Sequence, residues 1–176
     1  GGTRTVTDID GNVYQTIIIG NQEWMSENLK VTHYRNGDAI PHLTNDVDWT
    51  STSSGAYCVY ENNESIVSIY GRLYNWFAVD DRRNIAPVGW HVPTDAEFKE
   101  LEMYIGMSQS EADRSGLRGT NEGEKMKSTS GWNYNGNGTN LSGFNALPGG
   151  YRGSGGSFSY MTENGYWWSS SEYSDG

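Results

Sequence analysis

Residues 89–101 read GWHVPTDAEFKEL, and this stretch carries the strongest local structural signal in the chain. Thr94 and Glu97 are three residues apart, the spacing at which two side chains form a capping box at a helix start. Apolar residues then recur at i, i+3 and i+7 and form one stripe: Phe98, Leu101 and Ile105. The pattern predicts a helix from residue 95 to about residue 104, closed by Gly106.

The N-terminal residues predict a β-hairpin. Alternating runs at 5–9 and 12–19 flank Asp10-Gly11, which is a strong turn signal. Three residues also have the opening spacing of a calcium-binding loop: Asp8, Asp10 and Asn12. No glutamate follows at the twelfth position of such a loop, so the turn is the favoured interpretation.

The rest of the chain indicates short elements between long polar loops. Strands are expected at 28–34, 56–61 and 66–70, at 144–152 with a break at 148–150, and in a pair formed by 158–161 with 166–170. A first helix is expected at 71–79, where Leu73, Trp76 and Phe77 have helical spacing, and a short helical turn at 110–114. Residues 41–55 and 132–143 are expected to be loops. The pattern alone therefore predicts an α+β protein rich in loops.

Length and composition bound the class of protein. The 176 residues fit one domain, 1–176, and include 23 Gly, 12 Tyr and 7 Trp. The net charge of −10 and the pI near 4.6 argue against nucleic acid and anionic membranes as partners. No stretch approaches the roughly 20 apolar residues of a transmembrane segment. Abundant Tyr, Trp, Asn, Ser and Gly indicate a secreted bacterial protein at the cell surface.

Cys58 is the single cysteine, so the chain has no intramolecular disulfide and no two-cysteine active site. Its place in an alternating run, between Tyr57 and Val59, predicts a buried strand residue.

Four blocks of sequence together resemble the Fibrobacter succinogenes major paralogous domain family: DIDGNVYQTIIIGNQEWMSENL (8–29), YGRLYNWFAV (70–79), GWHVPTDAEF (89–98) and GFNALPGGYRG…GYWWSSSE (143–172). The third block, with the helix expected before it, is also similar to a segment of formylglycine-generating-enzyme-like proteins. This resemblance implies a C-type-lectin-like fold: two main helices around small, twisted, mostly antiparallel sheets, with long ordered loops that carry the binding face. Family members continue beyond the WWSSSE block into a closing strand, so domain 1–176 is expected to lack its C-terminal strand.

The composition of the late loops suggests a recognition surface. Tyr and Trp beside Asn, Ser and Gly combine rigid rings with adaptable hydrogen-bonding groups, and aromatic faces stack on sugars. We expect a non-enzymatic module that recognises or adheres to a glycan or a surface protein, through these candidates: Tyr151, Arg152, Tyr160, Tyr166, Glu172 and Tyr173. For each of these residues, a role in the core or in the structure is the alternative to a role in binding. Arg152 is more strongly expected to pair with a buried carboxylate than to touch a ligand, and one of Trp167 and Trp168 to face the core.

Two other functions remain open. A structural subunit of a pilus or cell-surface fibre would use residues 3–7 to pair with a neighbouring subunit, although pairing inside the domain is favoured. An enzyme is disfavoured for two reasons. No nucleophile elbow is visible in the sequence, and the three histidines are scattered: His33, His42 and His91. Calcium is possible in the acidic loops, but no spacing specifies its ligands.

Overall fold

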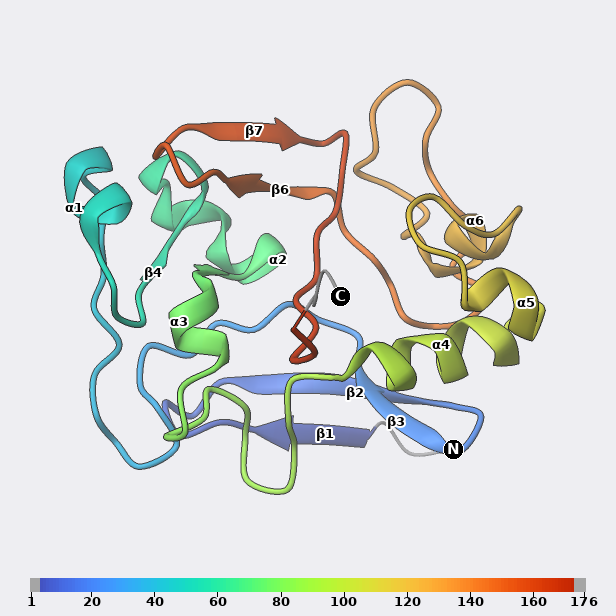
Figure 1. Ribbon diagram of the computed structural model, residues 1–176, viewed down its shortest axis with the longest axis horizontal. Helices are drawn as coiled ribbons and strands as arrows, with labels where there is room; N and C mark the ends of the chain where they lie inside the picture. Colours follow the sequence, from blue (N-terminus) through green and yellow to red (C-terminus); the bar gives the residue numbers. More distant parts are fainter. Residues whose placement is uncertain (1–3, 173–176) are drawn as a thin grey trace.

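The computed structural model describes residues 4–172, which form an α+β structure of small antiparallel sheets, short helices and long loops (Figure 1). One sheet has the order β1-β2-β3, and two sheets are two-stranded: β1 (Arg4–Thr7), β2 (Val13–Ile19), β3 (Gln22–Met25); β4 (Tyr57–Cys58) with β5 (Leu73–Tyr74); β6 (Gly149–Arg152) with β7 (Phe158–Met161). The helices are α1 (Asp46–Ser51), η1 (Tyr60–Asn62), η2 (Glu64–Ile66), α2 (Val67–Tyr70), α3 (Trp76–Val79), α4 (Asp95–Tyr104), α5 (Gln109–Ala112) and α6 (Glu122–Met126).

The predicted N-terminal hairpin is confirmed. β1 and β2 are antiparallel, with Thr7 opposite Val13 at the turn. The Asp8 carboxylate accepts hydrogen bonds from the backbone N–H of Asp10 (2.9 Å) and of Asn12 (2.9 Å). The aspartate spacing therefore builds a turn, as the favoured interpretation predicted. β1 pairs with β2 inside its own domain, as favoured, and forms an edge of the sheet.

The helix predicted from residues 89–106 is also confirmed, as α4. Thr94 Oγ1 accepts from Glu97 N (3.2 Å), and Thr94 N donates to Glu97 Oε2 (2.7 Å), which completes the capping box. The apolar stripe packs against the N-terminal sheet in a cluster whose buried members are Ile19, Trp24, Leu101, Trp132, Phe144 and Ala146. Phe98 and Ile105 lie at the edge of this cluster. The capping box thus fixes where the stripe meets the sheet.

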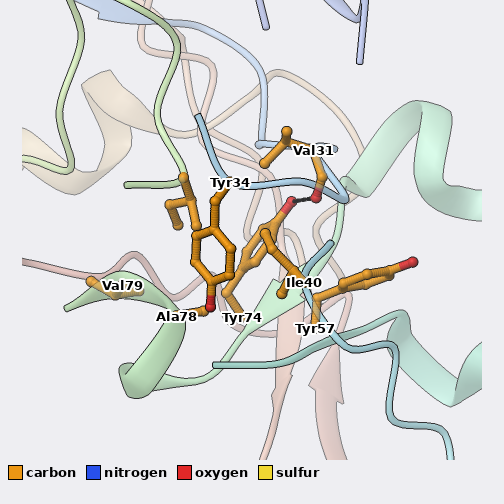
Figure 2. Close-up of a cluster of buried hydrophobic side chains, with 8 residues drawn as sticks. Val31, Tyr34, Ile40, Tyr57, Tyr74, Ala78 and Val79 are labelled. Carbon is orange, nitrogen blue, oxygen red and sulfur yellow. Dashed lines mark hydrogen bonds between the residues drawn. The ribbon is translucent and has the colours of Figure 1, made fainter. Parts of the chain in front are cut away.

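A second cluster of buried residues lies between the loop after β3, the β4–β5 pair and α3 (Figure 2). It contains Val31, Tyr34, Ile40, Tyr57, Tyr74, Ala78, Val79 and Ile85. The Tyr74 hydroxyl donates to the carbonyl oxygen of Val31 (2.7 Å), so a polar group is satisfied inside an apolar cluster.

Cys58 is buried in β4, as predicted, beside Trp49 and Ala56. Burial raises the pKa of its thiol to about 11, although Arg152 opposes the shift. The thiol is therefore protonated and shielded at neutral pH, which is the state of a packing residue.

Three expected elements in the first half were wrong. Residues 28–34 form no strand, because two of their backbone donors bond to side chains: Lys30 N to the Tyr14 hydroxyl and Thr32 N to Asp10. Residues 41–55 contain α1, whose start is capped by the Asn45 side chain. Residues 66–70 end η2 and form α2 instead of a strand.

The helix expected at 71–79 is divided. Gly71 ends α2 with φ of 70°, β5 pairs with β4, and the Asn75 side chain then caps the four-residue α3. The helical turn expected near 110–114 is present as α5. Residues 132–143 form a loop, as expected.

The strand pairing expected at the C-terminal end was also wrong. β7 pairs with β6, and residues 166–170 form no strand. The backbone of Ser170 donates to Pro93 O (2.8 Å) and the Trp168 indole donates to Tyr74 O (2.8 Å). Long-range bonds thus hold this segment between the N-terminal sheet and the β6–β7 pair (Figure 1). In the stretch 144–152 only β6 is extended in a sheet, after Pro148.

Candidate functional site

The β6–β7 hairpin has two different faces. Tyr151 lies opposite Ser159 and Arg152 lies opposite Phe158, so neighbouring pairs face opposite sides. The Arg152 guanidinium carbon lies 4.8 Å from the ring centroids of both Phe158 and Trp49, on the inner side. The side that carries Tyr151 is the outer face.

Three predicted site residues meet on the outer face, and we call them the tyrosine cluster: Tyr151, Tyr160 and Tyr166. The ring centroids of Tyr151 and Tyr160 are 5.9 Å apart with an interplanar angle of 24°, an offset and nearly parallel arrangement. The Tyr166 ring meets Tyr151 edge-on at 5.0 Å and 68°. Tyr160 is 49% exposed and Tyr166 is 51% exposed, so the cluster presents ring surface to solvent.

Arg152, the fourth predicted residue, faces inward and is fully engaged. It donates from Nε to Gly156 O (2.8 Å) and from Nη1 to Leu43 O (2.7 Å). Its Nη2 donates to Thr44 O (3.2 Å) and to Asp46 Oδ1 (2.7 Å). None of its side chain is exposed, so in this structure it joins two loops and is closed to a ligand. The carboxylate partner is present as expected, but Asp46 is 70% exposed instead of buried.

The last two predicted residues are not brought to the cluster. Glu172 is exposed beside Ser171, whose hydroxyl accepts a hydrogen bond from Asp95 N at the start of α4 (3.0 Å). This end of the segment lies toward α4 and away from β6 and β7 (Figure 1). Tyr173 lies outside the described residues.

A cleft of about 420 Å³ adjoins the tyrosine cluster and shares Tyr166 with it. The residues that line it come from segments far apart in the chain, and its aromatic members include Trp24, Trp90, Phe98, Phe144, Trp167 and Trp168. We call it the aromatic cleft. The sequence pattern did not predict the aromatic cleft, because no single segment of the chain contributes most of its lining.

Trp167 and Trp168 both line the aromatic cleft and are 39% and 46% exposed. The expectation that one of them faces the core rested on a strand at 166–170, which is absent. The Trp167 indole donates to Asn28 Oδ1 (3.3 Å), and its ring meets Phe144 edge-on at 5.8 Å. These contacts fix the Trp167 indole at the cleft, and the bond to Tyr74 O fixes that of Trp168, while part of each residue stays open to solvent.

A histidine–glutamate pair lies at the rim of the aromatic cleft. His91 Nε2 is 2.7 Å from Glu97 Oε1, and both residues line the cleft. Burial acts to raise the pKa of Glu97, but hydrogen bonds from Thr94 and His91 outweigh it and hold that pKa below its ordinary value. The carboxylate is therefore ionised at neutral pH and committed to the capping box.

Residues 4–172 contain neither a metal-binding cluster of side chains nor a membrane-spanning helix. No group of three or more His, Cys, Asp or Glu side chains is close enough there to hold a metal ion. None of the helices in the same range has the length and apolar character needed to cross a bilayer.

Comparison with known proteins identifies the family. Neither the curated proteins nor the solved structures contain a match to this chain. The family model described as the Fibrobacter succinogenes major domain matches residues 17–176, which includes α4, the aromatic cleft and the tyrosine cluster. The chain therefore belongs to the Fibrobacter succinogenes major domain family.

Proposed function

We propose that this domain is a non-enzymatic recognition module of the bacterial cell surface that binds a glycan at the tyrosine cluster. The observation that carries the proposal is the nearly parallel pair of rings of Tyr151 and Tyr160, of which Tyr151 is partly buried and Tyr160 is half-exposed. Aromatic rings left in solvent cost free energy, and contiguous exposed apolar groups commonly mark binding sites.

The chemistry of the cluster suits sugars. The apolar faces of pyranose rings stack on aromatic faces, while tyrosine hydroxyls reach polar partners. Within residues 4–172 the hydroxyls of Tyr151 and Tyr160 make no hydrogen bond, so both are available to a ligand. The Tyr166 hydroxyl accepts from Asn164 Nδ2 (3.2 Å), which adds an amide at the same place. Rings and hydrogen-bonding groups thus occur together at one site.

A binding role is favoured over catalysis by the state of the reactive groups. Cys58 is buried with a raised pKa, and Glu97 is occupied by the capping box. His33 contacts Asp10 (2.6 Å) and His91 contacts Glu97 (2.7 Å), in two separate pairs. These groups serve packing and capping.

The proposal includes a C-type-lectin-like arrangement and a location outside the cell. Small antiparallel sheets, the helix α4 and long loops are compatible with the fold that the resemblance implies. The net charge of −10 and the wealth of Tyr, Asn, Ser and Gly suit an exported protein. Calcium remains an open cofactor, to be tested together with binding.

A glycan array and titration calorimetry test this function, with and without calcium. We expect Tyr151→Ala and Tyr166→Ala to weaken the best glycan by about tenfold, since a stacked ring contributes on the order of 1 kcal/mol. Tyr104→Ala is the control, because Tyr104 is 67% exposed on α4. Equal affinities for all three variants would refute the assignment, and binding of proteins alone would replace the glycan as ligand.

A further inference from the structure

The contact between Tyr151 and Tyr160 conflicts with the regular geometry of a β-hairpin. Tyr151 lies opposite Ser159, so those two side chains share the outer face. Tyr160 follows Ser159 directly and in a regular strand would point to the inner face. Its ring nevertheless lies 5.9 Å from the ring of Tyr151, centroid to centroid. The backbone of β7 must therefore depart from the strand conformation at Tyr160.

The departure is a left-handed backbone at Tyr160, with φ of 62°, within β7 itself. This conformation is rare for a large side chain and is found where the surrounding structure imposes it. Gly150 has the same φ of 62°. A Cβ atom on Gly150 would lie 2.5 Å from Ser159 O and 2.8 Å from Met161 N, so only glycine permits this close approach.

The inner face at this point is already occupied. The Tyr60 ring packs on Phe158 with 5.3 Å between centroids, and its Cε2 would lie 2.8 Å from a Cβ on Gly150. An inward Tyr160 would meet this ring. The left-handed turn therefore moves Tyr160 from a filled inner face to the open outer face.

The turn is fastened from another part of the chain. Thr162 is also left-handed, with φ of 66°, which is an outlier for a β-branched residue. Asn133 holds it through two hydrogen bonds: Asn133 N to Thr162 O (2.7 Å) and Asn133 Nδ2 to Thr162 Oγ1 (2.6 Å). The Tyr160 carbonyl accepts from Glu163 N and Asn164 N and closes the turn.

We propose that Asn133 and Thr162 are positioning residues that hold Tyr160 beside Tyr151, and that the resulting ring pair selects oligosaccharides over monosaccharides. The two ring centroids are 5.9 Å apart, so a ligand that contacts both tyrosines along the surface extends beyond a single sugar ring. The choice of ligand class rests on the proposed function, whereas the positioning role rests on the backbone and its hydrogen bonds.

The test uses Asn133→Ala, with Ser130→Ala as a control on the same exposed loop. Ring-to-ring nuclear Overhauser effects report the Tyr151–Tyr160 contact, and calorimetry measures N-acetylglucosamine, glucose and their β-1,4-linked di- and trisaccharides. We expect Asn133→Ala to weaken the ring contact and to lower oligosaccharide affinity about fivefold, with monosaccharide affinity unchanged. Ser130→Ala should match the wild type. An unchanged ring contact and affinity in Asn133→Ala would overturn the positioning role.

A second pair of variants separates positioning from folding. Thr162→Val keeps the volume but loses the hydroxyl and disfavours the left-handed backbone, whereas Thr162→Asn tolerates that backbone and keeps a polar group. We expect Thr162→Val to resemble Asn133→Ala, and Thr162→Asn to retain the ring contact. If the ring contact responds in this way but no sugar binds, the proposed function fails and the positioning role stands. If oligosaccharides bind while every variant keeps the ring contact, the positioning role fails alone.

Discussion

Two tyrosine-rich regions of this domain use the same side chain in opposite ways. In the cluster around β4 and β5, Tyr34 and Tyr74 are 0% and 9% exposed and are surrounded by Val31, Ile40 and Ala78 (Figure 2). In the tyrosine cluster on β6 and β7, about half of the Tyr160 and Tyr166 surface remains in solvent. The first region closes its rings with aliphatic neighbours, and the second leaves about half of two of its rings open to solvent.

The difference between the regions lies in what surrounds the rings. The Tyr74 hydroxyl donates a hydrogen bond to the Val31 carbonyl, whereas the hydroxyls of Tyr151 and Tyr160 make no hydrogen bond within residues 4–172. A ring with a buried face and a satisfied hydroxyl stabilises the fold. A ring with an open face and a free hydroxyl can contribute free energy only when a partner arrives.

The largest expected effect is on the core side. Tyr74→Ala removes a buried ring and leaves a cavity, which should lower the free energy of unfolding by about 3–5 kcal/mol. Tyr166→Ala removes a ring that is half in solvent and should change it by less than about 0.5 kcal/mol. Urea denaturation measures both. A large loss of stability in Tyr166→Ala would show that Tyr166 is a core residue, which would contradict the contrast between the two tyrosine-rich regions.

The next largest effect on stability distinguishes two neighbouring residues of the β6–β7 hairpin, one on its inner face and one on its outer face. Arg152→Met should destabilise the domain by about 3 kcal/mol, because the carbonyls of Leu43, Thr44 and Gly156 lose their donor and the last of them is buried. Tyr151→Ala, one residue earlier on the outer face, should cost far less. Asp46→Asn is the matched control, because the exposed Asp46 supplies only one of the four bonds. Thermal unfolding of the three variants ranks them, and a mild Arg152→Met would refute the anchoring role.

These predictions depend on features that differ in how far the sequence reveals them. The capping box and apolar stripe of α4 lie within residues 94–105, so a local pattern was sufficient. The first hairpin was predictable for the same reason. The Asn45 cap of α1 is also local, and an Asn followed by Asp46 and Asp48 is a signal that could have located this helix.

The pairing of β7 and the shape of the site depend on distant residues. Whether β7 pairs with residues 149–152 or with 166–170 is decided by Tyr74 O and Pro93 O, which hold the later segment elsewhere. The left-handed Tyr160 depends on Gly150 and on Asn133, and tyrosine has no intrinsic preference for that conformation. Composition and position in the late loops predicted six candidates, Tyr173 among them, but only the fold shows that Tyr151, Tyr160 and Tyr166 lie in contact.

A smaller pair of substitutions tests the role of the hydroxyl in the core. Tyr74→Phe leaves the Val31 carbonyl without its donor and should cost about 1–2 kcal/mol. The Tyr34 hydroxyl is buried and makes no hydrogen bond within residues 4–172, so Tyr34→Phe should be neutral or stabilising. Chemical denaturation of both variants at one pH provides the measurement. If Tyr34→Phe costs as much as Tyr74→Phe, the Tyr34 hydroxyl has a partner in solution, and the core is more polar than the structure indicates.

The smallest expected effect is a pH-dependent change in stability that arises from Glu97, at the rim of the aromatic cleft. The pKa of Glu97 is lowered in the folded state, so its ionised form stabilises the fold above the unfolded pKa of about 4.5. This contribution is lost as the pH falls from there through the lower folded pKa. Because Glu97 is one-third exposed, we expect less than about 1 kcal/mol. Glu97→Gln cannot ionise, so wild type should exceed it in stability at pH 7 and converge with it once the pH falls below the lowered pKa of folded Glu97. Urea midpoints of both proteins across this range test the sign, and a gap that widens toward acid would contradict the ionised capping box.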